Sequence, residues 1–455
     1  MSRLTLKQAA EMCGGRVDPR FEGVSFFGAS MDTREIEPGQ LFIALKGESR
    51  DGHNYATRAI AKGAAAVLAE KPLDENVPAI YVPNVLTALG DLARAARKNA
   101  DLQVVGITGS VGKTTTKEMI AAVLCTTWET GKTSRNFNNN IGLPMTVLGL
   151  EDNCRMAVLE MGMNHRGEIS YLTSIAQPNL AVITNIGTMH IENLGSREGI
   201  LQAKLEILEG LQPGGCLIAN GDDDLLWKQN GKLPVETVYF GIENDRCQVV
   251  AEQICCEDAQ MRFCVRGFGS ELHIQLPAEG QHLVYDALAA ATVGLKMGVA
   301  PAQIEQALAS FENTGMRQKI YEVDGVTIIA ECYNAGPESM DAALSVLAGH
   351  KCTGRRIAVL GDMLELGARS QAEHYRIGRL AAARADMIFT YGRQSERILP
   401  GALTGGMSER RMHAFQTHEE LAEELRRVVE PGDVLLIKGS RGMRMEHVLE
   451  QFLQK

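Results

Sequence analysis

Short apolar runs separated by helix-compatible stretches recur through the middle of the chain. Four of these runs have the length and composition of buried parallel strands: 104–107, 156–159, 180–184 and 216–219. Polar and apolar residues then alternate over 248–276, which predicts an antiparallel appendage ahead of an Ala-rich helix at 285–297. The pattern predicts a doubly wound α/β domain over residues 99–314.

The two flanking regions show related patterns. Residues 1–98 combine predicted helices with short strand candidates, which favours a small α/β domain; the helices are predicted at 6–13, 55–62 and 85–98, and the strands at 24–27, 41–45, 65–69 and 80–82. Beyond residue 314 the alternation starts afresh with apolar runs at 326–330, 357–360, 387–391 and 434–437. This predicts a Rossmann-like domain over 315–455. The linkers are short, so the three domains are expected to meet across clefts.

Composition supports this division and narrows the possible functions. A chain of 455 residues corresponds to about three domains at roughly 150 residues each. The net charge of −10 and the lack of a basic run disfavour binding to nucleic acid. The longest apolar stretches reach about nine residues, short of the roughly 18 that cross a bilayer.

The N-terminus does not resemble a signal peptide, so a cytoplasmic location is expected. The ten cysteines form no CxxC pair, and neither disulfides nor structural zinc are predicted.

A glycine-rich segment carries the clearest chemical signal. The apolar run at 104–107 leads into a loop and then a helix-compatible stretch, and the loop contains Gly109, Ser110, Val111, Gly112, Lys113, Thr114 and Thr115. Backbone N–H groups at a helix start can surround phosphate oxygens, Lys113 can neutralise them, and the Thr114 hydroxyl can reach Mg²⁺. Ile107 stands where the eight-residue pattern has its first glycine, so this is the shorter GxxGKT form. The sequence has no guanine-reading NKxD segment, and ATP is the predicted nucleotide.

Three further residues suggest a metal site. Glu160 ends the second central strand and His190 follows the third, at the edge where doubly wound folds bind ligands. They could share Mg²⁺, although a histidine in such a place is more often a capping or core residue. Lys204 falls on the apolar stripe of a helix predicted at 197–211, where an unpaired ammonium is costly. Either its stem reaches solvent, or CO₂ converts it to a carbamate, an anionic metal ligand.

Together these segments resemble the Mur ligases, the ATP-dependent amide-forming enzymes of peptidoglycan synthesis. The resemblance covers all three predicted domains and rests on the phosphate loop, the Lys204 helix and nine further segments: 32–34, 38–45, 47–53, 136–144, 160–164, 185–190, 333–337, 361–367 and 438–443. It implies that residues 1–98 bind a UDP-sugar and that the substrates are UDP-MurNAc-tripeptide and D-Ala-D-Ala. The tripeptide carboxylate would attack the γ-phosphate of ATP, and the dipeptide amine would displace phosphate from the acyl phosphate. A monomer is expected.

The resemblance also implies roles for individual residues. Lys113 and Thr114 would hold phosphates and a first Mg²⁺, while Glu160, His190 and carbamylated Lys204 would organise a second metal. Other implied nucleotide contacts are Asn138, Asn139, His282, Arg317 and Glu331. The implied substrate contacts are Asp32, Thr33, Arg34, Lys46, Gly47, Asp51, His53, Asn334, Lys438, Ser440 and Arg441.

Two departures from the family pattern bear on the nucleotide. The family segment GxHNxxN has Leu283 and Asp286 in place of its asparagines, and Glu331 replaces an aspartate expected to face the ribose. One alternative is a folylpolyglutamate synthase, which lacks the UDP-sugar domain and the segment at 361–367. Another is a nucleotide-binding regulator with a degenerate site, against which the retained Lys113, Glu160 and Lys204 argue. The sequence does not indicate whether the third tripeptide residue is lysine or diaminopimelate.

Overall fold

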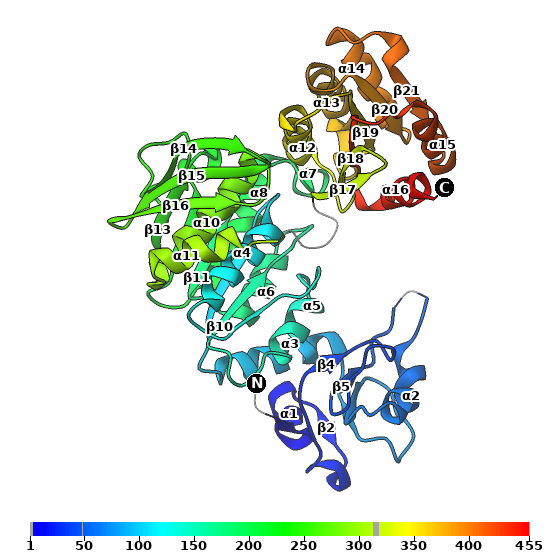
Figure 1. Cartoon of the computed structure of the whole chain (residues 1–455). Helices are drawn as coiled ribbons and strands as arrows, with labels where there is room; N and C mark the ends of the chain where they lie inside the picture. The colour runs from blue at the N-terminus through cyan, green and yellow to red at the C-terminus, as the bar shows by residue number, and fades with distance from the viewer. Residues whose placement is uncertain (1–2, 48, 313–317, 455) are drawn as a thin grey trace.

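The computed structural model describes residues 3–47, 49–312 and 318–454. Three α/β units follow one another along the chain, with the N-terminal unit in blue below, the central unit in cyan to yellow-green and the C-terminal unit in yellow to red above (Figure 1). None of the helices within these ranges combines the length and the apolar character that a bilayer crossing needs. The three-domain α/β architecture predicted from the sequence is confirmed.

The N-terminal unit is built on a five-stranded sheet in the order β2-β7-β6-β5-β4. Its strands are β2 (Arg16–Val17), β4 (Ala29–Ser30), β5 (Leu41–Ile43), β6 (Ala66–Ala69) and β7 (Ala79–Tyr81). The predicted strand at 24–27 is β3 (Ser25–Phe26), which lies outside this sheet and pairs with β1 (Leu4–Thr5). The helices are α1 (Leu6–Cys13), α2 (Ala56–Ala61) and α3 (Val85–Lys98). Arg97 of α3 donates to the carbonyls of Ala176 and Gln177, so this helix is tied to the central unit.

The central unit contains a nine-stranded sheet in the order β16-β15-β14-β13-β12-β11-β8-β10-β9. Its strands are β8 (Gln103–Thr108), β9 (Thr130–Lys132), β10 (Met156–Glu160), β11 (Leu180–Ile183), β12 (Cys216–Asn220), β13 (Glu236–Gly241), β14 (Val249–Glu257), β15 (Gln260–Gly267) and β16 (Ser270–Leu276). Residues 248–276 do not form a separate appendage, because β14 pairs in parallel with β13 and extends the main sheet. β15 runs antiparallel to both of its neighbours, β14 and β16, as the alternating pattern predicts.

Helices cover both faces of this sheet, and successive β10 residues enter the cores on opposite faces: Ala157 and Leu159 on one, Met156 and Val158 on the other. The central helices are α4 (Lys113–Cys125), α5 (Gly142–Leu148), α6 (Glu168–Ala176), α7 (Ile191–Leu194), α8 (Arg197–Leu205), α9 (Asp224–Trp227), α10 (Gln281–Met297) and α11 (Pro301–Ala309). The helix predicted at 197–211 changes to a 3-10 helix at Glu206, whose carboxylate accepts hydrogen bonds from the N–H groups of Gly167 and Ser170.

The C-terminal unit has a six-stranded sheet in the order β17-β18-β22-β19-β20-β21. Its strands are β17 (Lys319–Val323), β18 (Val326–Glu331), β19 (Arg356–Gly361), β20 (Met387–Tyr391), β21 (Met412–Phe415) and β22 (Val434–Lys438), parallel except for β17. The helices are α12 (Pro337–Gly349), α13 (Ser370–Arg384), α14 (Ile398–Thr404), α15 (His418–Val428) and α16 (Glu446–Leu453). Helix α12 begins next to the central unit. Side chains from its first turn therefore reach the cleft that contains the phosphate loop.

Candidate active site

A cleft of about 850 Å³ lies between the central and C-terminal units. Its floor is the phosphate loop together with the carboxyl ends of β10, β11 and β12, the edge at which doubly wound sheets bind ligands. The C-terminal unit supplies residues from β18, α12 and the end of β22 to the opposite wall. Among the predicted site residues, the cleft brings together Ser110, Val111, Gly112, Lys113, Thr114, Thr115, Asn138, Asn139, Glu160, His190, His282, Glu331, Asn334 and Lys438.

The phosphate loop has the expected strand–loop–helix geometry. Lys113 begins α4, and its ammonium donates to the backbone carbonyls of Gly109 and Ser110 at 2.8 and 3.3 Å. Gly109 has a φ of 156°, and a Cβ at this position would lie 1.8 Å from the Thr184 hydroxyl oxygen. Only glycine therefore fits where the loop passes β11.

Glu160 is the buried carboxylate at the centre of the cleft. It is 1% exposed, its Oε2 accepts a hydrogen bond from the Thr114 hydroxyl at 2.7 Å, and its Oε1 accepts one from the Asn138 amide at 2.8 Å. Asn139 instead stabilises the backbone at the start of α5, because its side-chain oxygen accepts hydrogen bonds from the N–H groups of Ile141 and Gly142. The Thr114 hydroxyl and the Glu160 carboxylate are neighbouring oxygen ligands of the kind that Mg²⁺ prefers.

Lys117 is a site residue that the sequence analysis missed. Its side chain is fully buried, and its ammonium donates to the Thr133 carbonyl at 2.7 Å. The same nitrogen lies 3.0 Å from Glu118 Oε1 and 4.0 Å from Glu160 Oε2. The signal that singled out Lys204 applies here too, since Lys117 falls on the apolar stripe that continues through Ile120 and Leu124 of α4.

His190 lies at the same edge but faces the C-terminal unit. Its Nδ1 is 2.6 Å from Glu365 Oε2, and its backbone has a φ of 61°. Burial lowers the pKa of His190, Glu365 acts in the opposite direction, and the charge of Lys113 lowers it further. Among the described residues no hydrogen bond or ion pair joins His190 to Glu160.

Lys204 is buried in α8, with 2% of the residue exposed. Its stem therefore does not carry the ammonium to solvent, which excludes the first interpretation of its place on the apolar stripe. Burial, together with the charge of Lys113, holds the pKa of Lys204 well below its usual range. Within the described part of the chain its side chain makes no hydrogen bond or ion pair. A lysine in this position is favoured as a neutral amine.

One wall of the cleft is lined by residues of α10, α4 and the C-terminal sheet. Asp286 accepts a hydrogen bond from the Thr116 hydroxyl at 2.7 Å, which ties α10 to α4 behind the phosphate loop. Glu331 Oε2 accepts one from the Lys438 ammonium at 2.8 Å, and burial lowers the pKa of His282 nearby. Leu283 is buried and lines the cleft, while Arg317 lies outside the described residues.

The predicted substrate residues fall into two groups. Those of the N-terminal unit do not line the cleft, and their observed contacts are local. Asp32 pairs with Arg34, which lowers the pKa of Asp32 to about 2, and Asp51 Oδ1 lies 2.6 Å from His53 Nδ1. Thr33 is buried, and Lys46 and Gly47 belong to the loop that returns to Asp51.

The second group lies in the C-terminal unit. Asn334 lines the cleft, and its side-chain oxygen accepts hydrogen bonds from the backbone N–H groups of Ala335 and Arg441. Ser440 is buried and donates to the Ala335 carbonyl at 3.0 Å, which fixes the loop after β22 to the loop after β18. These contacts place the two loops side by side at the cleft.

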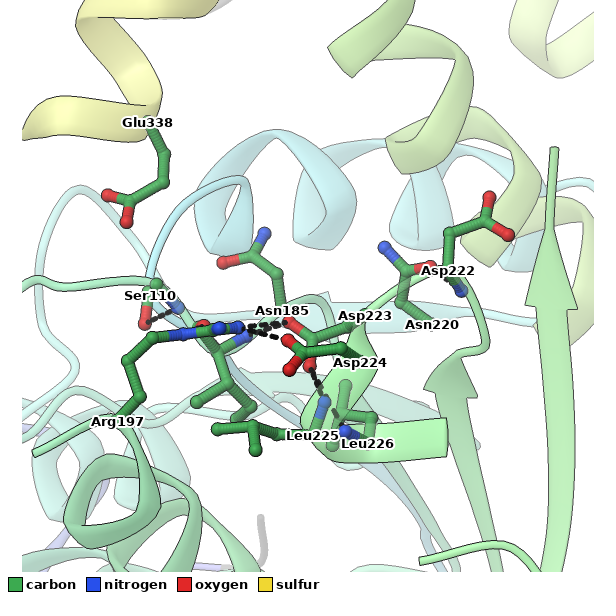
Figure 2. A network of polar contacts seen from close by, with 12 residues as sticks. Ser110, Asn185, Arg197, Asn220, Asp222, Asp223, Asp224, Leu225, Leu226 and Glu338 are labelled. Atoms are coloured by element: carbon green, nitrogen blue, oxygen red, sulfur yellow. Dashed lines mark hydrogen bonds and ion pairs between the residues drawn. The ribbon is translucent and has the colours of Figure 1, made fainter. Parts of the chain in front are cut away.

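A polar network fixes the loop that follows β11. From one side, Asp223 accepts the Ile186 N–H at 2.7 Å, and Arg197 donates to the Ile186 carbonyl and to Asp224. Figure 2 shows Glu338 of α12 above Ser110, on the other side of this network. Glu338 Oε1 accepts hydrogen bonds from the backbone N–H and hydroxyl of Thr188. The sequence analysis did not single out Glu338, because its partner is about 150 positions away and in another domain.

Comparisons with known proteins agree with this architecture. Three family models match in succession: the Mur ligase family catalytic domain at 27–97, the Mur ligase middle domain at 107–294 and the Mur ligase glutamate ligase domain at 316–441. The UDP-N-acetylmuramoyl-tripeptide–D-alanyl-D-alanine ligase of Bacillus subtilis is 40% identical over 461 residues, covering 100% of this chain and 99% of the relative. The Escherichia coli ligase of the same name is 34% identical, with 99% and 98% covered.

Solved structures give the same result. The MurF crystal structure from Acinetobacter baumannii superposes with a TM-score of 0.91 at 32% identity, covering 100% of both chains. MurF of Thermotoga maritima in complex with ADP reaches 0.82 at 30% identity, with 94% of this chain and 97% of that one covered. The chain therefore belongs to the Mur ligase family. Within the family it groups with the UDP-N-acetylmuramoyl-tripeptide–D-alanyl-D-alanine ligases, the MurF type, and not with the folylpolyglutamate synthases.

Proposed function

We propose that this chain joins D-Ala-D-Ala to UDP-MurNAc-tripeptide at the expense of ATP, in the synthesis of peptidoglycan precursors. The observation that carries the proposal is the cleft in which the phosphate loop, Glu160 and the C-terminal loops at Asn334 and Lys438 face one another. The full-length likeness to ligases of this name selects the substrates among the members of the family. A cytoplasmic location and a monomeric state remain predictions of the sequence.

The reaction needs two anions to meet. The tripeptide carboxylate attacks the γ-phosphorus of ATP and ADP leaves, giving an acyl phosphate. The amine of D-Ala-D-Ala then attacks the acyl carbon, phosphate leaves and the nitrogen loses a proton. Carboxylate and polyphosphate repel each other, so positive charge and N–H donors must be arranged in advance. In the proposed mechanism Lys113 and the N–H groups at the start of α4 provide that arrangement.

The oxygen ligands beside the phosphate loop suit Mg²⁺. Thr114 and Glu160 would hold it, because their oxygens are adjacent and already organised by Asn138. When bound, Mg²⁺ supplies charge neutralisation at the phosphates. The chain's own part is to hold the Glu160 carboxylate in its orientation, a role that suits the buried ammonium of Lys117 at 4.0 Å.

The structure also bears on the proposed carbamate at Lys204. A carbamate forms when a neutral amine attacks CO₂, which creates an N–C bond and releases a proton. The burial of Lys204 and the nearby Lys113 charge both favour the neutral amine. The resulting carbamate would carry a negative charge that attracts Lys113, whereas the neutral amine does not. We propose that carbamylated Lys204 and His190 complete the second metal site with Glu160.

The two groups of predicted substrate residues fit a long substrate. The UDP end would bind the N-terminal unit near Asp32, Thr33, Arg34, Lys46, Gly47, Asp51 and His53, and the peptide carboxylate would enter the cleft. In the C-terminal unit, four residues would contact the dipeptide and the nucleotide: Asn334, Lys438, Ser440 and Arg441. Glu331 would accept hydrogen bonds from the ribose while it remains paired with Lys438.

The proposal is tested by measuring phosphate release from ATP with UDP-MurNAc-tripeptide, with and without D-Ala-D-Ala. Full turnover is expected only with both substrates, and mass spectrometry should detect the UDP-MurNAc-pentapeptide. Lysine and diaminopimelate forms of the tripeptide are supplied in parallel, which identifies the accepted third residue. Equal turnover with a folate and glutamate, or none with either tripeptide, would contradict the proposal. Lys113→Ala serves as the inactive control.

A further inference from the structure

A thiol, an imidazole and a carboxylate come together on the exposed face of the antiparallel end of the central sheet. Cys264 of β15 and His273 of β16 are direct cross-strand partners, and the Cys264 sulfur lies 3.2 Å from His273 Nδ1. Glu271 stands two residues before His273 and therefore on the same face of β16. One ligand atom from each of the three lies within 4.8 Å of the others. None of the three lines the ligase cleft.

A bulge in β14 brings a fourth side chain to this group. The register of β14 against β15 shifts between Glu252 and Cys255, and Gln253 within the bulge has a φ of 54°. Gln253 Oε1 lies 3.5 Å from the Cys264 sulfur. Left-handed backbone is unfavourable for a residue with a side chain, and bulges re-aim side chains locally. Three adjacent strands thus contribute sulfur, nitrogen and oxygen atoms to one point.

We propose that Cys264, His273 and Glu271 bind Zn²⁺, with the Gln253 amide oxygen as the fourth ligand. Tetrahedral Zn²⁺ with a sulfur at about 2.3 Å and a nitrogen at about 2.0 Å separates these two atoms by about 3.5 Å. The observed 3.2 Å is close to this value before any metal enters. A thiolate and one carboxylate together carry two negative charges, which match the charge of the ion. Binding releases the thiol proton to the buffer.

The donor set distinguishes this site from the Mg²⁺ positions of the cleft. Thiolate and imidazole are ligands that Zn²⁺ prefers, whereas Mg²⁺ requires oxygen. The surroundings favour a cation, because Glu305 lies beside the group and the positive charge of Arg266 is already paired with Glu252. The sequence has no CxxC pair, and on that ground no structural zinc is predicted from it. Cross-strand register brings together ligands seven and nine positions apart, which that spacing rule does not detect.

A zinc ion here would connect the edge strand β16 to β15 and to the bulge of β14. β16 is the last strand of the sheet on this side, and among the described residues no further strand pairs with its outer edge. An ion that binds only the folded protein stabilises it in proportion to its occupancy. The expected consequence is a thermal midpoint that rises with Zn²⁺, at a site independent of the ligase reaction.

The test uses the full-length protein under reducing conditions with excess Mg²⁺, which occupies the oxygen sites. Zn²⁺ binding is measured by calorimetry, and Co²⁺ is added as a probe because a thiolate bound to Co²⁺ absorbs in the near ultraviolet. Cys264→Ser and His273→Gln are compared with Cys255→Ser, a control that removes an exposed cysteine of β14 outside the group. Wild type and the control are expected to bind one equivalent of Zn²⁺ and to show the thiolate band.

Cys264→Ser should lose the Co²⁺ band, and both site variants should bind Zn²⁺ at least about ten-fold more weakly. Ligase activity at saturating Mg²⁺ is expected to be the same in all variants, which shows that each has folded. A wild type without the band overturns the proposal. So does a band that persists in Cys264→Ser, because the metal is then bound by another cysteine.

Discussion

Glu338 and Thr188 join the C-terminal unit to the loop beside the phosphate-binding segment. Glu338 Oε1 accepts hydrogen bonds from the Thr188 backbone N–H at 2.8 Å and from its hydroxyl at 2.9 Å. The preceding residue, Gly187, donates its N–H to the Ser110 hydroxyl oxygen at 2.9 Å. The second Glu338 oxygen is buried and accepts no hydrogen bond within the described residues. A negative charge is therefore held next to the place where nucleotide phosphates are expected.

The charge of Glu338 should weaken nucleotide binding. Glu338→Gln keeps an oxygen acceptor for Thr188 but removes the repulsion of phosphate, so ADP is expected to bind about five-fold more tightly, on the order of 1 kcal/mol. Calorimetric titration with ADP measures this. Asp341→Asn is the matched control, since Asp341 lies on the same helix but pairs with Arg384. Unchanged or weaker ADP binding by Glu338→Gln would show that its charge does not act on the nucleotide.

Lys117 should control the affinity for Mg²⁺ through Glu160. Among the described residues, Lys117 is the only lysine whose ammonium lies within 4.0 Å of both Glu118 and Glu160, and Lys117→Met removes it. Mg²⁺ should then support ADP binding only at concentrations raised about ten-fold or more, because the Glu160 carboxylate loses the buried neighbour that helps to hold it in position. ADP binding without Mg²⁺ should change little, which separates this effect from a collapse of the phosphate loop.

The control for Lys117 is Lys132→Met. Lys132 also pairs with Glu118, but it is exposed and has no ion pair with Glu160. The Mg²⁺ concentration that Lys132→Met needs for ADP binding should stay within about two-fold of wild type, because exposed ion pairs contribute little. Equal shifts in the two variants would contradict a specific role for Lys117. Breaking a buried pair can cost about 3 to 5 kcal/mol, so thermal unfolding of each variant is measured alongside.

Lys204→Ala should reduce turnover by about 10² to 10³, the loss expected when an organising charge leaves a catalytic site. Short carboxylic acids should restore part of the activity, since they can supply the missing anion. Carbon-13 NMR of wild type supplied with labelled CO₂ should show a carbamate that is absent from the variant. Only the neutral amine reacts with CO₂, so the carbamate and the activity should fall together as pH drops through the lowered pKa of Lys204. Full activity in Lys204→Ala would contradict the assignment.

Glu331→Ala should raise the Michaelis constant for ATP about ten-fold or more, because a lost charge-assisted hydrogen bond is worth roughly 1.5 to 3 kcal/mol. The same change leaves the buried Lys438 ammonium without its partner at 2.8 Å. A double-mutant cycle with Lys438→Met separates this loss from the ribose contact. The Mg²⁺ dependence should hardly change, since Glu331 lies in another domain from Thr114. Unchanged ATP kinetics would mean that the ribose is held elsewhere.

A second contact between the units should depend on pH. His350, which follows α12, has its Nδ1 2.6 Å from Glu279 Oε2 of the central unit. The hydrogen bond with Glu279 raises the pKa of His350, although burial acts against it. The stabilisation is therefore complete below the ordinary histidine pKa and is lost as pH rises through the raised value. The thermal midpoint of wild type should fall relative to His350→Gln over this range. Parallel pH curves for the two proteins would contradict this.

Local signals in the sequence determined much of the fold and part of the site. Buried parallel strands are short apolar runs, and a glycine loop between such a run and a helix start indicates phosphate binding wherever it occurs. Lys113, Thr114 and Glu160 were found in this way, and they meet in the cleft because parallel strands end at the same sheet edge. The roles given to individual substrate residues rest on resemblance and stay predictions.

Other features depended on contacts that the sequence pattern does not contain. Helix α8 ends before Glu206, whose carboxylate accepts hydrogen bonds from N–H groups near the start of α6, and β14 extends the main sheet because its first residues pair with β13. Lys117 shares the apolar-stripe signal of Lys204, yet only the structure shows which carboxylates it meets. Periodicity and motifs report the neighbours of a residue along the chain. Partners across strands and domains are set by register and docking, which tertiary packing alone decides.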